Sequence, residues 1–282
     1  MLGLDHRLFH EHAFAIVDRL QFPEGKCPSG LHMEPLVPQR LKGSERMLPG
    51  LVSLGSLSDD LAAACLDLLT EQMVAGGPLL FSALLKTDAS ADDVARHLKN
   101  TLLVETPEHG LYLRQFDSRL FVQYDWLLMP EQRARMFGPI TGWTLCLDGE
   151  WRTYMPPLDV KPVLRWRLTA EQAACIEALQ QINRAMASLP VEGIDSRRTR
   201  AQDGYLLLER ARKHGLKAER CLTRFLEHGW TVHPHFDQHP EVSCRLQRMS
   251  PDDDFPYLAA ISDLDVAAFS RIREEMAKGD SP

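Results

Sequence analysis

The densest group of potential metal ligands lies near the C-terminal end of the chain, where three histidines and an aspartate fall within seven residues. They are His233, His235, Asp237 and His239. Imidazole groups bind zinc well, and a loop can direct three of them at one ion. Structural zinc sites usually have paired, regularly spaced ligands, which this stretch lacks. We therefore predict a proline-rich loop without a metal, and keep a metal-dependent hydrolase at His233, His235 and His239 as the alternative.

The spacing also differs from a known dinuclear pattern. The stretch is one residue away from the HxHxDH motif of metallo-β-lactamase-type hydrolases, in which the last histidine directly follows the aspartate. Here Gln238 separates Asp237 from His239, and no histidine follows His239. The insertion moves the last imidazole to a different side of the chain, so the pattern argues against two adjacent metal ions.

Other catalytic and cofactor-binding motifs are missing from the sequence. Ser53 has glycines three residues before it and two residues after it, which breaks the GxSxG turn. Nothing matches the phosphate-binding patterns GxxxxGK[ST] or GxGxxG. Neighbouring cysteines have at least 22 residues between them, so no CxxC pair is available for zinc or dithiol chemistry. We predict no catalytic residues, no metal and no cofactor.

The charge balance is acidic and uneven along the chain. The sequence has 32 Lys and Arg against 39 Asp and Glu, a formal net charge of -7, which argues against binding nucleic acid over the whole surface. A short basic run at 196–200 leaves a nucleic-acid-binding module as a third hypothesis. The same run could instead steer an acidic partner to the C-terminal part.

One charged group lies among apolar residues in the middle of the chain. If 111–116 is extended, Arg114 shares a face with Tyr112 and Phe116, and its guanidinium is then partly buried. A buried guanidinium needs a carboxylate partner, and Asp117 or Asp18 can supply one. We interpret Arg114, Asp117 and the nearby Arg119 as a structural ion-pair group at a strand-to-helix corner.

The elements around these residues alternate between strand and helix. Apolar runs at 12–17 and 78–85 predict buried strands, and Ser58 and Ser90 are suitable N-caps for helices. Asp148-Gly149 is typical of a type I′ hairpin turn. We predict an α/β domain over 1–160, with a mixed sheet flanked by helices.

Prolines punctuate the chain after Met155, and from Thr169 onward the pattern is mostly helical. We therefore predict a smaller, mainly helical lobe over 161–282. No run of about 18 apolar residues could cross a membrane, and the N-terminus lacks the apolar core of a signal peptide. We expect a cytoplasmic protein that does not contact a membrane.

Several of these segments, in the same order and spacing, resemble the effector adaptor and chaperone family of type VI secretion systems (Tap or Tec proteins). The resemblance covers about residues 12–145 and is most specific at 113–119, followed by Phe137-Gly138-Pro139. Ser118 stands where the family usually has the proline of Asp-Pro-Arg. The segments that carry the resemblance are 15–18, 48–54, 77–82, 97–98, 113–119 and 137–140, with Trp143.

The resemblance implies a binding protein, not an enzyme. Members bind a toxic effector in the bacterial cytoplasm and load it onto the VgrG spike protein, with no metal, nucleotide or nucleic acid involved. The structural motif then comprises Asp18, Arg114, Asp117, Arg119, Gly138 and Pro139. For the variable C-terminal lobe, we expect Arg197, Arg198 and Trp230 to contact the effector, because Arg and Trp are enriched at interface centres.

Overall fold

The chain divides into two compact units, residues 1–173 and 174–282. The computed structural model describes residues 6–22, 24–190, 193–250 and 253–279. The division falls later than the predicted boundary at residue 160, because the segment after the last strand packs on the N-terminal unit. The indole N–H of Trp166 donates to the Thr101 carbonyl at 3.0 Å, and the Leu168 N–H donates to the Glu105 carbonyl at 2.8 Å.

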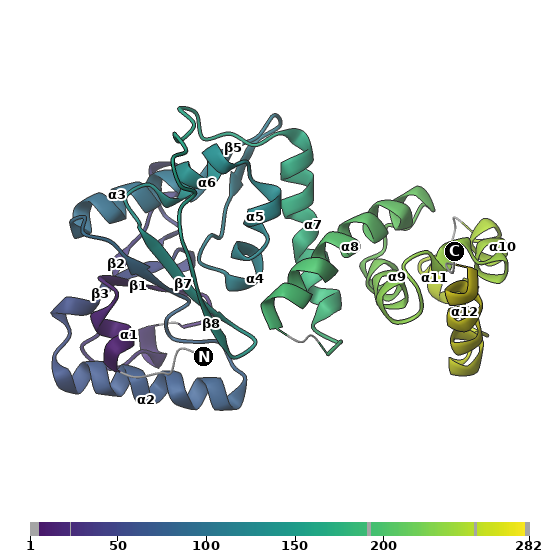
Figure 1. Cartoon of the computed structure of the whole chain (residues 1–282), viewed down its shortest axis with the longest axis horizontal. Helices are drawn as coiled ribbons and strands as arrows, with labels where there is room; N and C mark the ends of the chain where they lie inside the picture. The colour runs from purple at the N-terminus through teal and green to yellow at the C-terminus, as the bar shows by residue number, and fades with distance from the viewer. Residues whose placement is uncertain (1–5, 23, 191–192, 251–252, 280–282) are drawn as a thin grey trace. The chain divides into compact units, whose positions relative to one another are not determined.

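The N-terminal unit is built on a six-stranded sheet in the order β2, β3, β1, β4, β7, β8 (Figure 1). Its strands are β1 (Phe14–Val17), β2 (Glu34–Pro35), β3 (Gly50–Ser53), β4 (Ala83–Lys86), β7 (Gly142–Leu147) and β8 (Glu150–Tyr154). A separate two-stranded sheet pairs β5 (Leu103–Glu105) with β6 (Gly110–Tyr112).

The predicted α/β class is confirmed, although every neighbouring pair in the large sheet is antiparallel and the sheet is therefore not mixed. The helical crossover from β3 to β4 explains the difference. These two strands run in the same direction, but β1 lies between them and runs the opposite way. A crossover helix therefore joins strands that are not neighbours.

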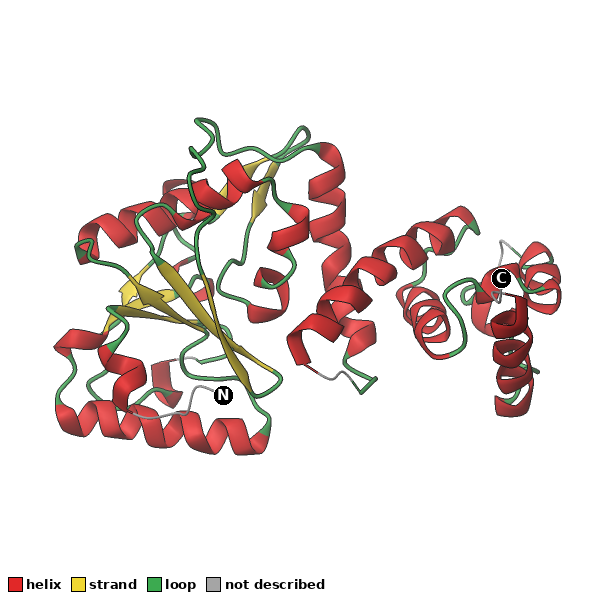
Figure 2. Ribbon diagram, viewed as in Figure 1, coloured by secondary structure: helices red, strands yellow, loops and turns green. Residues whose placement is uncertain are grey.

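Helices cover both faces of the sheet (Figure 2). On one face, α2 (Asp59–Ala75) buries Cys65 and Leu69 against Ala15, Val17 and Leu84. Several helices lie on the other face. They include α3 (Ala91–Thr101), α4 (Ser118–Phe121), α5 (Tyr124–Leu127) and α6 (Pro130–Phe137). There the fully buried Trp143 ring packs against Phe121 and Phe137, with ring centroids 5.2 and 6.3 Å away.

Local sequence signals set the ends of these elements as predicted. The Ser58 and Ser90 hydroxyls accept hydrogen bonds from backbone N–H groups three residues on, at 3.3 and 3.2 Å, and so cap α2 and α3. The β7–β8 hairpin turns at Asp148 and Gly149, which both have positive φ, of 53° and 78°. This is the backbone that a type I′ turn requires.

The C-terminal unit consists of helices, as the sequence predicts. They are α7 (Ala170–Met186, which begins in the N-terminal unit), α8 (Gly193–Lys213), α9 (Glu219–Thr231), α10 (Pro240–Gln247), α11 (Pro256–Ala260) and α12 (Val266–Gly279). Gly229 lies inside α9. A Cβ there would come within 2.3 Å of the Leu207 side chain, so glycine permits the close packing of α8 on α9.

The centre of this unit is aromatic and contains one buried histidine. Phe225 packs against Phe236 and Tyr257, with ring centroids 4.9 and 5.4 Å away. His228 is 4% exposed, and its Nδ1 lies 2.6 Å from the Tyr257 hydroxyl. Burial and, to a smaller extent, the charge of the nearby Arg224 lower the pKa of His228 to about 4, against the opposing effect of Glu227.

None of the helices that the structure describes is long and apolar enough to cross a lipid bilayer.

The buried histidine predicts that the full chain loses stability on acidification. Unfolding returns His228 to an ordinary pKa near 6.5, so the unfolded state binds a proton first as the pH falls, and stability declines between about pH 6.5 and pH 4. We expect a loss of about 2 kcal/mol between pH 7 and pH 5, measured by calorimetry or urea unfolding.

The variant His228→Gln should lose this pH dependence, while the matched variant at an exposed position, His235→Gln, should keep it. An equal pH dependence in all three proteins would contradict the assignment to His228.

Candidate functional site

Four ionised side chains that are far apart in the sequence meet at the end of β1. Arg114 Nη2 donates to Asp18 Oδ2 at 2.7 Å and lies 3.7 Å from Asp117 Oδ2. Arg119 binds Asp117 with two nitrogens, Nη2 at 2.8 Å and Nε at 3.0 Å. Both predicted carboxylate partners of Arg114 are therefore present. We call Asp18, Arg114, Asp117 and Arg119 the charged corner.

Each carboxylate of the charged corner is held by the backbone around it. Asp18 follows β1 directly, and its Oδ1 accepts a hydrogen bond from the Leu20 N–H at 3.1 Å. Asp117 is the N-cap of α4 and accepts from the Arg119 N–H at 3.1 Å. The Arg114 guanidinium stacks over the Phe116 ring, 5.5 Å from its centroid. This contact fixes the position of Arg114 in the charged corner.

Both carboxylates are buried, with side chains 4% and 5% exposed at Asp18 and Asp117, whereas Arg119 remains about half exposed. Burial favours the neutral form of Asp117, but the hydrogen bond and charge of Arg119, with the charge of Arg114, outweigh it and hold the pKa of Asp117 below its ordinary value. Asp117 is therefore ionised at neutral pH, and its contribution to stability is lost only as the pH falls below about 4.

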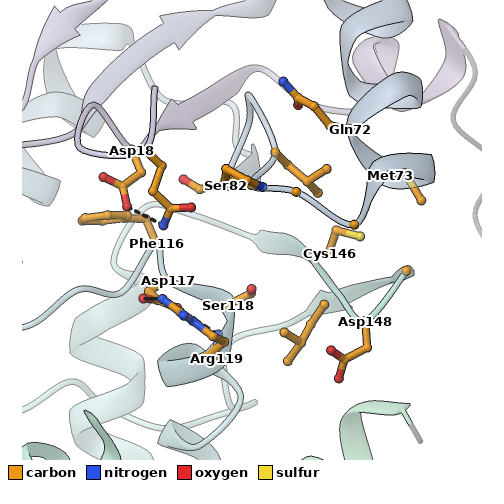
Figure 3. A pocket seen from close by; sticks show the side chains of 17 residues that line it. Asp18, Gln72, Met73, Ser82, Phe116, Asp117, Ser118, Arg119, Cys146 and Asp148 are labelled. Carbon is orange, nitrogen blue, oxygen red and sulfur yellow. Dashed lines mark hydrogen bonds and ion pairs between the residues drawn. The ribbon is translucent and has the colours of Figure 1, made fainter. Parts of the chain in front are cut away.

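The charged corner forms one wall of a cavity of about 650 Å³ (Figure 3). The opposite walls come from the end of α2, the glycine-containing turn after it and the tip of the β7–β8 hairpin. Its polar lining includes Asp18, Gln21, Gln72, Ser82, Asp117, Ser118, Arg119 and Asp148. A volume of this size falls within the range of small-ligand pockets.

Two potential nucleophiles of the cavity, Cys146 and Ser82, are not activated. Burial raises the pKa of the Cys146 thiol to about 11, so the thiol is protonated at neutral pH. The Ser82 hydroxyl donates to the carbonyl of Ile16 at 3.0 Å. The charged and polar groups of this wall can form ionic contacts and hydrogen bonds.

The two remaining motif residues, Gly138 and Pro139, lie in a second corner, between α6 and β7. Gly138 has a positive φ of 53°, and a Cβ there would lie 2.2 Å from the imidazole of His97. The same imidazole is 2.9 Å from the carbonyl of Met136, and the Thr87 hydroxyl donates to the Pro139 carbonyl at 2.7 Å. This corner fastens α3 and the end of β4 to the start of β7.

The histidines predicted as the alternative metal ligands do not converge. His233 Nδ1 accepts from the His235 N–H at 3.1 Å, whereas His239 is 8% exposed and its Nε2 lies 2.9 Å from Glu275 Oε2. Asp237 is buried beside Arg210 and His214, 3.3 and 3.2 Å away. Within the described residues, no group of three or more His, Cys, Asp or Glu is placed to hold a metal ion.

The predicted effector contacts lie in the C-terminal unit at different depths. Arg197 is 9% exposed on α8, and Arg198 beside it is partly exposed. Trp230 is half-buried and packs on Gly204, where a Cβ would come within 2.7 Å of its ring. Arg197 and Trp230 thus contribute to the helix packing of this unit, and Arg198 offers the more accessible side chain.

The contact of His97 with Gly138 and the cavity beside the charged corner could not be predicted from the sequence. The sequence Phe137-Gly138-Pro139 is typical of a tight corner. No local pattern identifies His97 as the side chain that packs against Gly138. The cavity is lined by four separate segments, within 18–21, 72–82, 116–119 and 146–149, and has no contiguous sequence pattern.

Comparisons of the chain with protein-family models, with curated proteins and with solved structures gave no match.

Replacing Asp117 by Asn should destabilise the full chain by about 2 kcal/mol, because asparagine keeps the N-cap but loses the charge that pairs with Arg119 and Arg114. Urea unfolding measures this change. The matched control is Asp93→Asn, which removes an exposed carboxylate paired with Arg96 and should change stability much less. Equal effects of the two substitutions would show that the charged corner contributes no more than a surface ion pair.

Replacing Gly138 by Ala should cost about 1 to 3 kcal/mol more than replacing Gly149 by Ala. Both glycines have positive φ, so both variants carry the backbone penalty, but only the Cβ at Gly138 collides with another residue, His97. Thermal unfolding of the two full-length variants checks the difference, and the same midpoint for both would contradict the close approach of His97.

Proposed function

We propose that this chain is a cytoplasmic adaptor and chaperone of a bacterial type VI secretion system. In this function it binds a toxic effector protein and loads it onto the VgrG spike protein, by protein-protein binding without catalysis. The observation that carries the proposal is the charged corner. Charged residues of the segment 114–119, where the family resemblance is most specific, meet Asp18 in space and form a buried ionic group beside a cavity.

The geometry of this group suits a fixed scaffold for recognition. Its two carboxylates are held by guanidinium groups and by backbone N–H groups, so their positions are set before any partner arrives. Preorganised polar groups lower the entropy cost of binding. Arg119 is about half exposed at the cavity wall. It can contact a partner without breaking the ion pairs that Arg114 makes with Asp18 and Asp117.

An adaptor must cover apolar surface of its cargo and release it later. Interfaces of this kind bury about 1,600 Å² in total, and their centres are enriched in aromatic residues, Met and Arg. The N-terminal unit supplies the shared scaffold in this proposal, and the helical C-terminal unit, with Arg197, Arg198 and Trp230, supplies selectivity for one effector.

The alternative, a metal-dependent hydrolase at His233, His235 and His239, has less support. His239 is directed at Glu275, away from a shared site with the other two, and Gln238 separates it from Asp237. This is the physical consequence of the extra residue in the spacing.

Co-expression of the full chain with the spike protein and the toxin that we expect its neighbouring genes to encode tests the proposal. We expect the chain to elute with both proteins in size-exclusion chromatography, and not with the spike and toxin of a different type VI cluster, which are the matched control. Absence of any complex with the neighbouring partners would contradict the proposal. A purified chain that holds one zinc per molecule, and loses it in His235→Ala, would favour the hydrolase.

A further inference from the structure

A second groove lies on the N-terminal unit, formed by segments that the charged corner does not use. It has a volume of about 750 Å³. One side is the 3-10 helix η2 (Gln39–Leu41), and the others are the end of α3, the strand β5 and the segment 164–166. All of these segments belong to the N-terminal unit.

The most exposed large apolar side chain of the described residues, Leu164, lines this groove with 96% of its surface accessible. The backbone on either side of it is fixed. The Val163 N–H donates to the Glu131 carbonyl at 3.1 Å, and the Trp166 carbonyl accepts from the Glu105 N–H at 3.1 Å. The buried Trp166 indole is anchored on Thr101. The backbone around Leu164 is therefore held on both sides, so its exposed side chain is preorganised for contact with another surface.

Two arginines flank this leucine. Arg40 and Arg165 both line the groove and are exposed, and neither has an ion pair within the part of the chain that the structure describes. Lys99 also lines it, but its ammonium group is 2.7 Å from Glu34. Glu105 is the carboxylate among the lining residues.

This local excess of positive charge stands against the composition of the unit. Residues 1–173 contain 17 Lys and Arg and 22 Asp and Glu. Unpaired guanidinium groups beside an exposed leucine complement a segment that carries carboxylates next to an apolar side chain, because guanidinium and carboxylate form paired, charge-assisted hydrogen bonds.

We infer that this groove binds an extended acidic segment of a partner protein, with carboxylates on Arg40 and Arg165 and an apolar side chain on Leu164. A nucleic acid fits less well, because the groove offers two unpaired cations and a bare leucine where a phosphate backbone needs several cations. The inference goes beyond the proposed function in naming a surface and a partner chemistry, and it rests on that function where the partner is the effector or the spike.

Two probes test the inference with the full chain. One is the effector or spike from the co-expression experiment. The other is a short fluorescein-labelled peptide in which glutamates flank a single leucine, with a lysine-for-glutamate peptide as its control. The test variant is Arg40→Glu with Arg165→Glu. The matched control, Lys26→Glu with Arg46→Glu, makes the same charge change at exposed residues outside the groove.

We expect the groove variant to weaken binding of the acidic peptide and of the protein partner about tenfold or more, and the matched control to weaken it much less. Leu164→Asp should reproduce the loss. The affinity should also fall with added salt. The lysine peptide should not bind.

The possible outcomes separate the two proposals. Protein partners that bind the wild type and the groove variant equally would overturn the inference and leave the adaptor function intact. Peptide binding that depends on Arg40 and Arg165, in a chain that binds no effector or spike, would support the inference and contradict the function. If the wild type bound neither the acidic peptide nor a protein partner, both proposals would be overturned. If it bound single-stranded DNA as tightly as the acidic peptide, the assignment of the groove to a polypeptide would be overturned.

Discussion

The N-terminal unit depends on partners for two buried carboxyl groups. Asp18 and Asp117 are almost completely removed from water, and an isolated charge in such a place is strongly unfavourable. Arg114 lies between them and pairs with both, while the N-terminal turn of α4 and the backbone after β1 supply N–H donors. The ion pairs therefore link the end of the central strand, β1, to the segment that leads into α4.

The same constraint explains how fold and cavity are related. Because Asp18 directly follows β1 and α4 begins after Asp117, the ion pairs fix where strand and helix meet, and the space left beside them is the cavity. The second corner, where Gly138 lies against His97, fixes the other helices of this face. Two separate corners thus fix how the helices of this face meet the sheet.

The sequence predicted those features that depend on neighbouring residues. Ser58, Ser90 and Asp148-Gly149 act locally, and their roles are confirmed. The partners of Arg114 could also be predicted, since a buried guanidinium leaves few choices. The antiparallel order of the sheet, the place of Gly229 inside a helix and the groove around Leu164 could not. Each depends on which distant segments come together, and a crossover helix between non-adjacent strands has the same pattern as one between neighbours.

The central claim, that this molecule works by binding another polypeptide, is tested most directly by hydrogen-deuterium exchange of the full chain with and without its effector. The account predicts slower exchange in the segments that form the Leu164 groove and in exposed parts of α8, with little change in the already protected strand β1. Identical exchange in every peptide at saturating effector would contradict it.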